Sequence, residues 1–268
     1  MRTLIHLSDL HFGRVDETII PPLVERITSV NPDLIAISGD LTQRARRRQF
    51  QQARAFLDLL PFPKIVVPGN HDVPLFDLAA RILAPFGGYR RGIDANLEPL
   101  LIDEEMAVIG LNSARGLIAG GKGRLNLQQI DRAVARLRPL SSSLIKVIVT
   151  HHPFDLPAGH RPEHLVGRAR MAMAQFAEVG ADLFLAGHLH VSHVGHTAER
   201  YRIAGHSALV VQAGTMSTRG RGELNTFNVL RIARPEMTVE RYSWETGSHT
   251  FAQSFAGTFR HTQEGWTA

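Results

Sequence analysis

Cysteine is absent from this sequence of 268 residues. Its absence excludes disulfide bonds, thiolate metal ligands and a cysteine nucleophile. Long apolar runs are also missing, since none reaches the roughly 18 residues that a membrane-spanning helix requires. The first residues, MRTLIHLSDLHFG, lack the basic and apolar regions of a signal peptide. We therefore expect a cytoplasmic protein without a membrane span.

Lysine is scarce, so arginine carries most of the positive charge that gives a net charge of +5. A basic chain suits nucleic acids or small anionic substrates, but most of these arginines are scattered, which favours ordinary solvated surfaces. The arginine run of residues 44–48 either forms a rim that attracts an anionic substrate or is a solvated helix face. Arg115, Arg219 and Arg221 allow the same two interpretations.

The hydrophobic pattern predicts a mixed α/β protein, and 44% of the residues are hydrophobic, enough for a packed core. Short apolar segments predict strands at residues 3–7, 34–38, 64–67, 106–111, 144–150, 183–186, 208–213, 226–232 and 237–244. Amphipathic segments predict helices at residues 22–30, 46–60 and 127–137. This order indicates one mixed sheet or two packed sheets with helices outside. We expect a single domain over residues 1–268, with no assigned structure in the tail from about residue 247.

Five of the predicted strands end in loops that carry carboxylates, amides or imidazoles. These loops contain Asp9-Leu10-His11, Gly39-Asp40, Gly69-Asn70-His71-Asp72, His151-His152-Pro153 and Gly187-His188-Leu189-His190. Ligands in open α/β sheets bind beyond the carboxyl ends of strands, so we expect these loops to converge on one crevice. Three of the loops begin with glycine, which lets the backbone turn sharply and approach an ion or phosphate closely.

The side chains in these loops suit transition metals, because aspartate oxygen and histidine nitrogen bind Zn, Mn, Fe and Co. In an extended segment, residues two apart share a face. Asp9 with His11, and His188 with His190, are therefore each expected to clamp one ion or two neighbouring ions. Each motif alone has an ordinary explanation, such as a turn or a structural histidine. Chance is a poor account of all five in this order, each after an apolar segment.

The ordered set resembles the signature of the calcineurin-like metallophosphoesterase superfamily: Asp-x-His, Gly-Asp, Gly-Asn-His-Asp/Glu, His, then Gly-His-x-His. The chain length and the segment Gln212-Ala213-Gly214-Thr215 look most like the bacterial class III cyclic nucleotide phosphodiesterases and their glycerophosphodiesterase relatives. The resemblance implies an α/β fold, a four-layer α-β-β-α sandwich of two mixed sheets flanked by helices. It also implies a metal-dependent phosphoric ester hydrolase.

The resemblance further implies a binuclear metal centre with two divalent or trivalent ions of Mn, Fe, Zn or Co. The first ion would be held by Asp9, His11, Asp40 and His190. The second would be held by Asp40, Asn70, His151 and His188, so that Asp40 bridges the two. His151 is preferred to its neighbour because it lies at the strand end. The histidines without motif support are treated as non-ligands, although some could line the cleft: His152, His193, His196 and His206.

Asn70 and His71 are the implied catalytic residues. His71 would face the substrate's phosphate instead of a metal and would donate a proton to the departing alkoxide. Asp72 would either orient the His71 ring or cap the following turn. Two ions about 3.5–4 Å apart would clamp the attacking and leaving oxygens and would lower the pKa of a bound water to roughly 7. A metal-bound hydroxide is then the expected nucleophile, and both ions, Asn70 and His71 would meet the developing charge.

The expected function is a phosphodiesterase that acts on cyclic nucleotides or other small phosphodiesters, such as glycerophosphodiesters. One alternative is a nuclease of the same superfamily, although its DNA-processing members are usually longer and carry extra domains. A second alternative is an inactive scaffold that binds a partner, and the full set of ligands argues against it. The expected partner is a small anionic phosphoester, with nucleic acid less favoured. The oligomeric state stays open, with a homodimer as one candidate.

Overall fold

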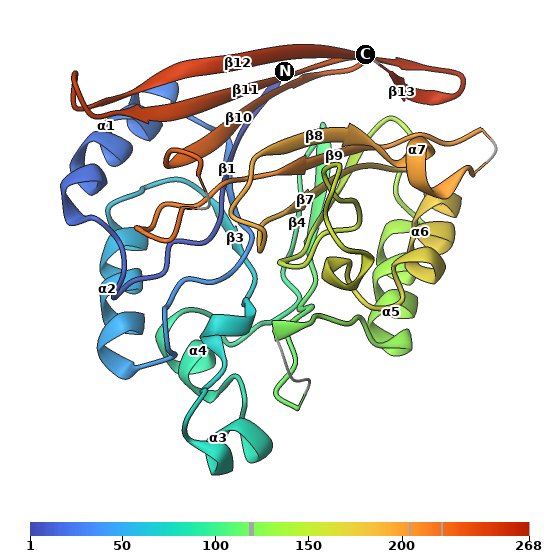
Figure 1. The fold of residues 1–268 in the computed structure, drawn as a ribbon. Helices are drawn as coiled ribbons and strands as arrows, with labels where there is room; N and C mark the ends of the chain where they lie inside the picture. Colours follow the sequence, from blue (N-terminus) through green and yellow to red (C-terminus); the bar gives the residue numbers. More distant parts are fainter. Residues whose placement is uncertain (118–120, 204, 221, 268) are drawn as a thin grey trace.

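The computed structural model describes residues 1–117, 121–203, 205–220 and 222–267, and it contains two mixed β-sheets with helices on their outer faces (Figure 1). The first sheet has seven strands in the order β13-β12-β11-β10-β1-β2-β3. Their bounds are β1 (Arg2–Leu7), β2 (Leu34–Ile37), β3 (Lys64–Val66), β10 (Thr226–Ala233), β11 (Glu236–Glu245), β12 (Thr250–Thr262) and β13 (Gly265–Thr267). Within this sheet, β1, β2 and β3 are parallel, whereas the β10 to β13 meander is antiparallel.

The second sheet has six strands in the order β4-β5-β6-β7-β9-β8. Their bounds are β4 (Leu100–Ile102), β5 (Met106–Gly110), β6 (Ile145–Val149), β7 (Ala181–Ala186), β8 (His193–His196) and β9 (Leu209–Gln212). The central strands β5, β6, β7 and β9 are parallel, and the edge strands β4 and β8 are antiparallel to their neighbours. Both sheets are therefore mixed, as the sequence predicts.

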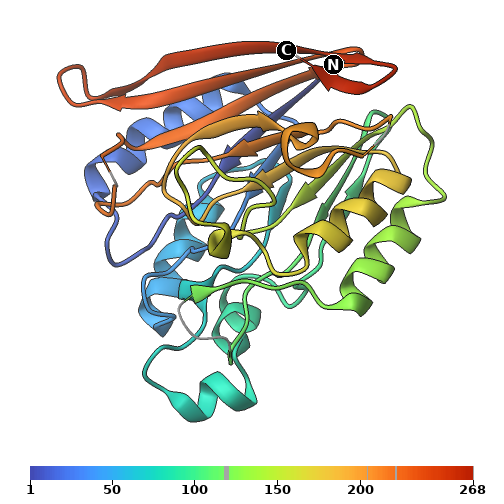
Figure 2. The ribbon, with the colours of Figure 1, turned by 45° about the vertical axis from the view of Figure 1, so that its right-hand side comes forward.

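The helices fall into two groups on opposite sides of the sheets. Their bounds are α1 (Ile20–Val30), α2 (Arg47–Asp58), α3 (Leu78–Leu83), α4 (Gly87–Gly92), α5 (Leu127–Leu137), α6 (Ala169–Glu178) and α7 (Thr197–Tyr201). Helices α1 and α2 lie beside the first sheet, and α5 and α6 lie side by side on the second (Figures 1 and 2). Among the described residues, no helix has the length and apolar character needed to cross a bilayer.

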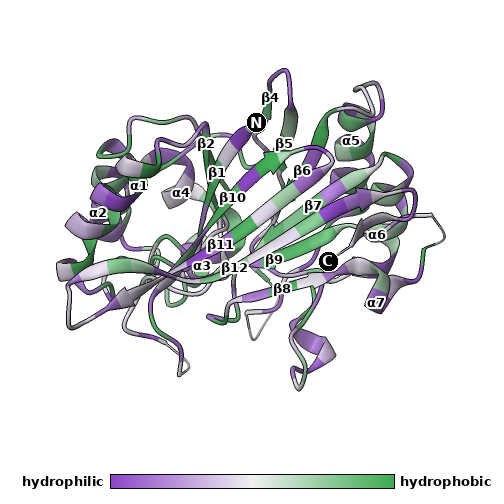
Figure 3. Cartoon of the chain, turned by 90° about the horizontal axis from the view of Figure 1, so that it is seen from above, coloured by the Kyte–Doolittle hydropathy of each residue, from purple (hydrophilic) through white to green (hydrophobic). Residues whose placement is uncertain are grey.

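Three clusters of buried apolar side chains define the layers. Between the sheets, Leu4 of β1 and Val147 of β6 belong to one cluster. On the outer face of the first sheet, α2 contributes Phe56 to a second cluster, and on the outer face of the second sheet, α6 contributes Phe176 to a third. Seen from above, apolar residues run along the central strands of both sheets (Figure 3). The α-β-β-α sandwich is thus confirmed.

The central strands are largely apolar because they are buried on both faces, as parallel strands between helices and a second sheet must be; the exceptions include Lys146 of β6 and Asp182 of β7. Every residue of β2, β5, β6 and β7 is buried. Because these strands are parallel, their carboxyl ends lie at the same edge of each sheet. The five motif loops follow β1, β2, β3, β6 and β7 and so lie at these edges.

The tail from about residue 247 is ordered, and this corrects the expectation that left it unassigned. It forms the outer strands β12 and β13 of the first sheet, where Trp266 is fully buried. The sequence pattern does not predict β12, because much of the strand is exposed and buried residues do not alternate regularly with exposed ones along it. The sequence pattern also does not predict β4, β8 or the helices α3, α4, α6 and α7, because the periodicity of their apolar residues is weak.

Candidate metal centre

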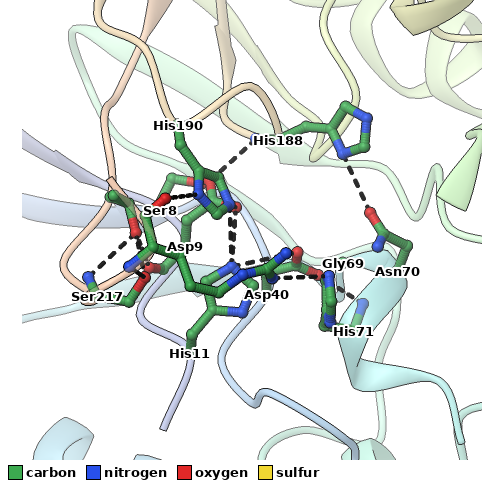
Figure 4. Close-up of polar contacts among 12 residues, drawn as sticks. Ser8, Asp9, His11, Asp40, Gly69, Asn70, His71, His188, His190 and Ser217 are labelled. Atoms are coloured by element: carbon green, nitrogen blue, oxygen red, sulfur yellow. Dashed lines mark hydrogen bonds and ion pairs between the residues drawn. The ribbon is translucent and has the colours of Figure 1, made fainter. Parts of the chain in front are cut away.

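The five motif loops converge on one place, where seven oxygen and nitrogen donors meet. Figure 4 shows six of the residues that supply them: Asp9, His11, Asp40, Asn70, His188 and His190. In the first group of donors, His190 Nε2 lies 3.1 Å from both His11 Nε2 and Asp9 Oδ1. His11 Nε2 lies 3.5 Å from Asp9 Oδ1 and 3.7 Å from Asp40 Oδ2. Donors that are each about 2.0–2.1 Å from a tetrahedral ion lie roughly 3.4 Å from one another. The spacing of this group is therefore that of atoms around a shared cation.

The second group of donors lies on the other side of Asp40. His151 Nε2 is 3.3 Å from Asp40 Oδ2 and 3.1 Å from Asn70 Oδ1. His188 Nδ1 is also 3.1 Å from Asn70 Oδ1. Asp40 Oδ2 thus faces one histidine of each group, which is the position of a bridging oxygen.

Five of the proposed ligands have left-handed backbone conformations, which corrects the expectation of extended segments. The φ angles are 53° at Asp9, 48° at His11, 52° at Asp40, 73° at His188 and 59° at His190. The paired ligands reach the site because the loops are held by hydrogen bonds from Asp9 N to Gly39 O and from His11 N to Asp40 O. Left-handed residues other than glycine cost of order 1–3 kcal/mol each and cluster at functional sites.

Two of the motif glycines are required by close packing around the donors. A Cβ atom at Gly187 would collide with Ser8 Oγ and Asp9 Oδ2, and one at Gly69 would collide with Asp40 Oδ1. The glycines therefore admit the carboxylates of neighbouring loops, in agreement with the expected close approach of the backbone.

The outer nitrogens of two histidines are hydrogen-bonded in the way that metal ligands require. His151 Nδ1 lies 2.8 Å from Ser38 O, and His190 Nδ1 lies 3.0 Å from Arg219 O. A ring nitrogen that faces a carbonyl carries the proton, so Nε2 of each ring is left with a lone pair for a metal. Among the described residues, the buried Asp9 Oδ1 faces the Nε2 atoms of His190 and His11, at 3.1 and 3.5 Å. The donor set fits a pair of cations.

Charge in the site is distributed between carboxylates and imidazoles. Burial alone would raise the pKa of Asp9 and of Asp40, but the neighbouring histidines outweigh it and hold both below their usual values. Burial would lower the pKa of His151, yet Asp40 outweighs this and raises it to about 9. Burial and the charge of His151 lower the pKa of His188 to about 3. The positive charge of a protonated imidazole such as His151 thus balances the negative charge of the buried carboxylates, as metal cations would.

The contacts of His152 favour its neighbour His151 as the ligand. His152 Nε2 lies 2.7 Å from Gly121 O, and His152 Nδ1 lies 2.9 Å from Ser113 Oγ. Both ring nitrogens are therefore engaged by the protein, although the ring lies against that of His188 with centroids 4.4 Å apart. The other unsupported histidines, His193, His196 and His206, do not line the cleft above the donors.

Asp72 does not contact the His71 ring, and it caps its own turn, Asn70–Asp72, instead of a following one. Its buried carboxylate accepts hydrogen bonds from the backbone N–H groups of Leu41, Thr42 and Gly69, at 3.1, 2.8 and 2.9 Å. The 3₁₀ turn of Asn70–Asp72 directs this side chain back into the protein. Asp72 therefore joins two of the metal-site loops.

His71 lies beside the donors, where two arginines contact its ring. Its Nδ1 lies 3.0 Å from Gln43 O and 3.2 Å from Arg44 Nη1, and Arg219 Nη1 lies 3.0 Å from its Nε2. Burial lowers the pKa of His71. The ring is therefore neutral in this arrangement, with Nδ1 donating to Gln43 O and Nε2 accepting from Arg219.

A cleft of about 360 Å³ opens above the donors, and its lining is rich in cations. Arg44 and Arg219 line it, whereas residues 46–48 are exposed at the start of α2. The arginine run is therefore part rim and part solvated helix face. Arg115 also lines the cleft but donates to Asn112 O and Ala114 O, and Arg221 lies outside the described residues.

Eight lining residues were not singled out by the sequence: Gln43, Val73, Leu75, Arg81, Gly121, Lys122, Glu163 and His164. Their positions depend on how the loops pack over the cleft, and only Gln43 and Val73 lie near a motif.

The family model for calcineurin-like phosphoesterases matches residues 2–192. A probable glycerophosphodiester phosphodiesterase, GpdQ, of Arcobacter nitrofigilis is 26% identical over 70% of this chain and 71% of its own length. A probable cyclic nucleotide phosphodiesterase of a Synechococcus species is 30% identical over 46% of this chain and 43% of its own length.

Solved structures are similar in fold. A dimetal phosphatase from Danio rerio superposes with a TM-score of 0.70 at 13% identity, over 97% of this chain and 99% of its own. A purple acid phosphatase from yellow lupin seeds superposes with a TM-score of 0.67 at 10% identity, over 96% of this chain and 53% of its own.

Proposed function

Because the chain belongs to the calcineurin-like phosphoesterase family, we propose that it is a two-metal phosphodiesterase acting on cyclic nucleotides or other small phosphodiesters. The observation that carries the proposal is the pair of donor groups that share Asp40 Oδ2 at the base of a cationic cleft. Relatives named as glycerophosphodiester and cyclic nucleotide phosphodiesterases support the diester class.

The proposed metal ligands are Asp9, His11, Asp40, Asn70, His151, His188 and His190. When bound, two ions of Mn, Fe, Zn or Co neutralise phosphate charge and make water a stronger acid. The spacing of the donors and the absence of cysteine support harder or borderline metals.

Phosphate binding and proton transfer are assigned to residues that line the cleft. Arg44 and Arg219 bring positive charge to the phosphate, in a site where water is partly excluded and such charge is effective. His71 faces the same space. If Arg219 turns from His71 Nε2 to the phosphate, Nε2 is free to take up a proton from solvent, and the resulting imidazolium is placed to pass that proton to the leaving group. Asn70 fixes the geometry of the second donor group through its Oδ1.

The proposal is tested with protein that is stripped of metal and reloaded with one defined metal at a time. The substrate panel consists of bis-p-nitrophenyl phosphate, p-nitrophenyl phosphate, 3′,5′- and 2′,3′-cyclic nucleotides, glycerophosphodiesters and single-stranded DNA. We expect metal-dependent turnover with a higher kcat/KM for the chromogenic diester than for the monoester. A clear advantage for the monoester would reverse the diester assignment, and preferred cleavage of DNA would favour a nuclease. Homodimer formation and a cytoplasmic location stay predictions.

A further inference from the structure

Helix α3 and the segment before it expose a group of large apolar side chains. The α3 patch consists of Leu75, Phe76, Leu78, Ile82, Leu83 and the neighbouring Leu117. Phe76 is 77% exposed and Leu83 is 84% exposed, and α3 buries none of its residues. Single exposed apolar side chains are ordinary, but several within one short stretch of the chain, as at residues 75–83, indicate a binding surface.

The patch is held in a fixed place, although it projects from the body of the protein (Figures 1 and 2). Arg81 of α3 donates from Nε to Gly116 O at 2.6 Å and from Nη1 to Pro74 O at 3.3 Å. These bonds tie the helix to the loop that carries Leu117. Residues 74–86 carry two charged side chains. Arg81 is partly buried and makes these internal bonds, whereas Asp77 caps the helix by accepting from Ala80 N while it stays exposed. The other exposed side chains of this segment are apolar.

The patch is continuous with the cleft above the donors. Leu75 belongs to both, and Val73 and Arg81 line the same side of the cleft. Beyond them the lining becomes cationic, with Arg44, Lys122 and Arg219. A ligand whose phosphate lies on the donors would therefore place a substituent directed toward α3 against apolar side chains.

We propose that the enzyme acts on amphiphilic phosphodiesters, whose hydrocarbon chain binds the α3 patch while the phosphodiester enters the cleft. The proposal rests on the proposed function, which it narrows to a substrate class. The juxtaposition favours a substrate chain, because one occupant then explains the anion-binding cleft, the exposed apolar patch and the residue they share. A second copy of the protein on the patch would cover Leu75 and restrict access to the cleft.

The experiment compares three diesters with the same leaving group: methyl, hexyl and dodecyl p-nitrophenyl phosphate, each below its micelle concentration. Because the leaving group is constant, a difference in rate reports the bound chain. For the metal-loaded enzyme we expect kcat/KM to rise about tenfold or more from methyl to hexyl, since each fully buried methylene is worth a factor of roughly four.

The double variant F76S/L83S should lose this chain-length effect while it keeps the wild-type rate on the methyl diester. Both side chains are highly exposed, so the variant should fold. The matched control is Leu59→Ser, which removes a side chain that is 56% exposed and does not line the cleft. It should keep the full chain-length effect.

Each other outcome overturns the proposal. Turnover of all three diesters at one rate would remove the chain-binding role and leave the phosphodiesterase intact. No metal-dependent turnover of any diester would overturn the proposed function as well. A dimer in sedimentation velocity that F76S/L83S converts to monomer, without a chain-length effect, would assign the patch to a second copy.

Discussion

The backbone N–H of His71 donates a 2.7 Å hydrogen bond to Oδ1 of Asp40. This bond turns the other carboxylate oxygen, Oδ2, toward His11 in one donor group and His151 in the other. The loop that supplies Asn70 and His71 therefore orients the carboxylate at the centre of the site. Asp40 links the proposed metal sites both through space and through this loop.

Asp40→Ala should lose both metals, or nearly all activity, because it removes the oxygen that both donor groups face. Metal content after gel filtration, measured by inductively coupled plasma spectrometry, checks this together with turnover of bis-p-nitrophenyl phosphate. Asp131→Ala is a matched control, since it removes an exposed aspartate of α5 that does not line the cleft. Two metals per chain and normal turnover in Asp40→Ala would show that Asp40 is not the bridge.

His71→Ala should slow the hydrolysis of a 3′,5′-cyclic nucleotide far more than that of bis-p-nitrophenyl phosphate, with metal content unchanged. An alkoxide leaving group needs a proton, whereas p-nitrophenolate leaves without one, and general acid catalysis is typically worth 10²–10⁴-fold. The ratio of kcat values for the two substrates is the measurement. Equal losses on both would point to phosphate binding, and loss of metal would make His71 a ligand.

Arg219→Ala provides the comparison for His71. Arg219 contacts the His71 ring and lines the cleft, so we expect it to meet the charge of the phosphate, which both substrates carry. Its removal should therefore lower kcat/KM by a similar factor on both. A loss restricted to the cyclic nucleotide would instead place Arg219 in the proton transfer with His71.

Asp72→Ala should destabilise the metal-free protein by about 1–3 kcal/mol, because buried backbone N–H groups lose their acceptor. Urea denaturation followed by circular dichroism measures the change. The control for loss of an exposed carboxylate that accepts from a backbone N–H is Asp77→Ala, which removes a helix cap worth about 1 kcal/mol. If the two variants lose the same free energy, the burial of Asp72 adds nothing to the joining of the loops.

The metal-free protein should be most stable near pH 6.5, the usual pKa of an unfolded histidine. The pKa of His151 is raised to about 9 by Asp40, against the effect of burial, so its contribution is complete below about 6.5 and is lost as pH rises toward 9. Burial, with His151 nearby, lowers the pKa of His188 to about 3, and burial lowers that of His6 to about 3, so both destabilise the protein as pH drops below about 6.5. Burial raises the pKa of Asp72 to about 7, which opposes these two histidines between about pH 4 and 7 but offsets only one of them.

Thermal denaturation of chelator-treated protein between pH 5 and 9 checks this profile. Metal-loaded protein is the control, and it should lose the decline above pH 6.5, because a bound cation takes the place of the proton on His151. A metal-free protein whose melting temperature rises steadily from pH 6.5 to 9 would contradict the ion pair between His151 and Asp40.

The sequence alone determined the alternation of strands and helices and the loops that carry the proposed ligands, and its family resemblance implied the layers. Strands buried on both faces leave continuous apolar segments, and loops at their carboxyl ends carry the donors, so local patterns placed Asp9, Asp40 and His188 after the correct strands. Local patterns failed where one face of a strand is solvated, as in β12, and where apolar side chains point outward, as in α3.

Only the tertiary structure decided how the donors meet. Asp9 and His11 are two residues apart, but they share the site because the Gly39–Asp40 loop holds both in left-handed conformations. The Asp72 side chain points inward because its carboxylate accepts hydrogen bonds from the backbone N–H groups of Leu41 and Thr42, about thirty residues away in the chain. Likewise, Leu75 joins the apolar α3 patch to a cationic cleft built by distant loops. Such relations depend on backbone hydrogen bonds and packing between remote segments, which composition and spacing do not encode locally.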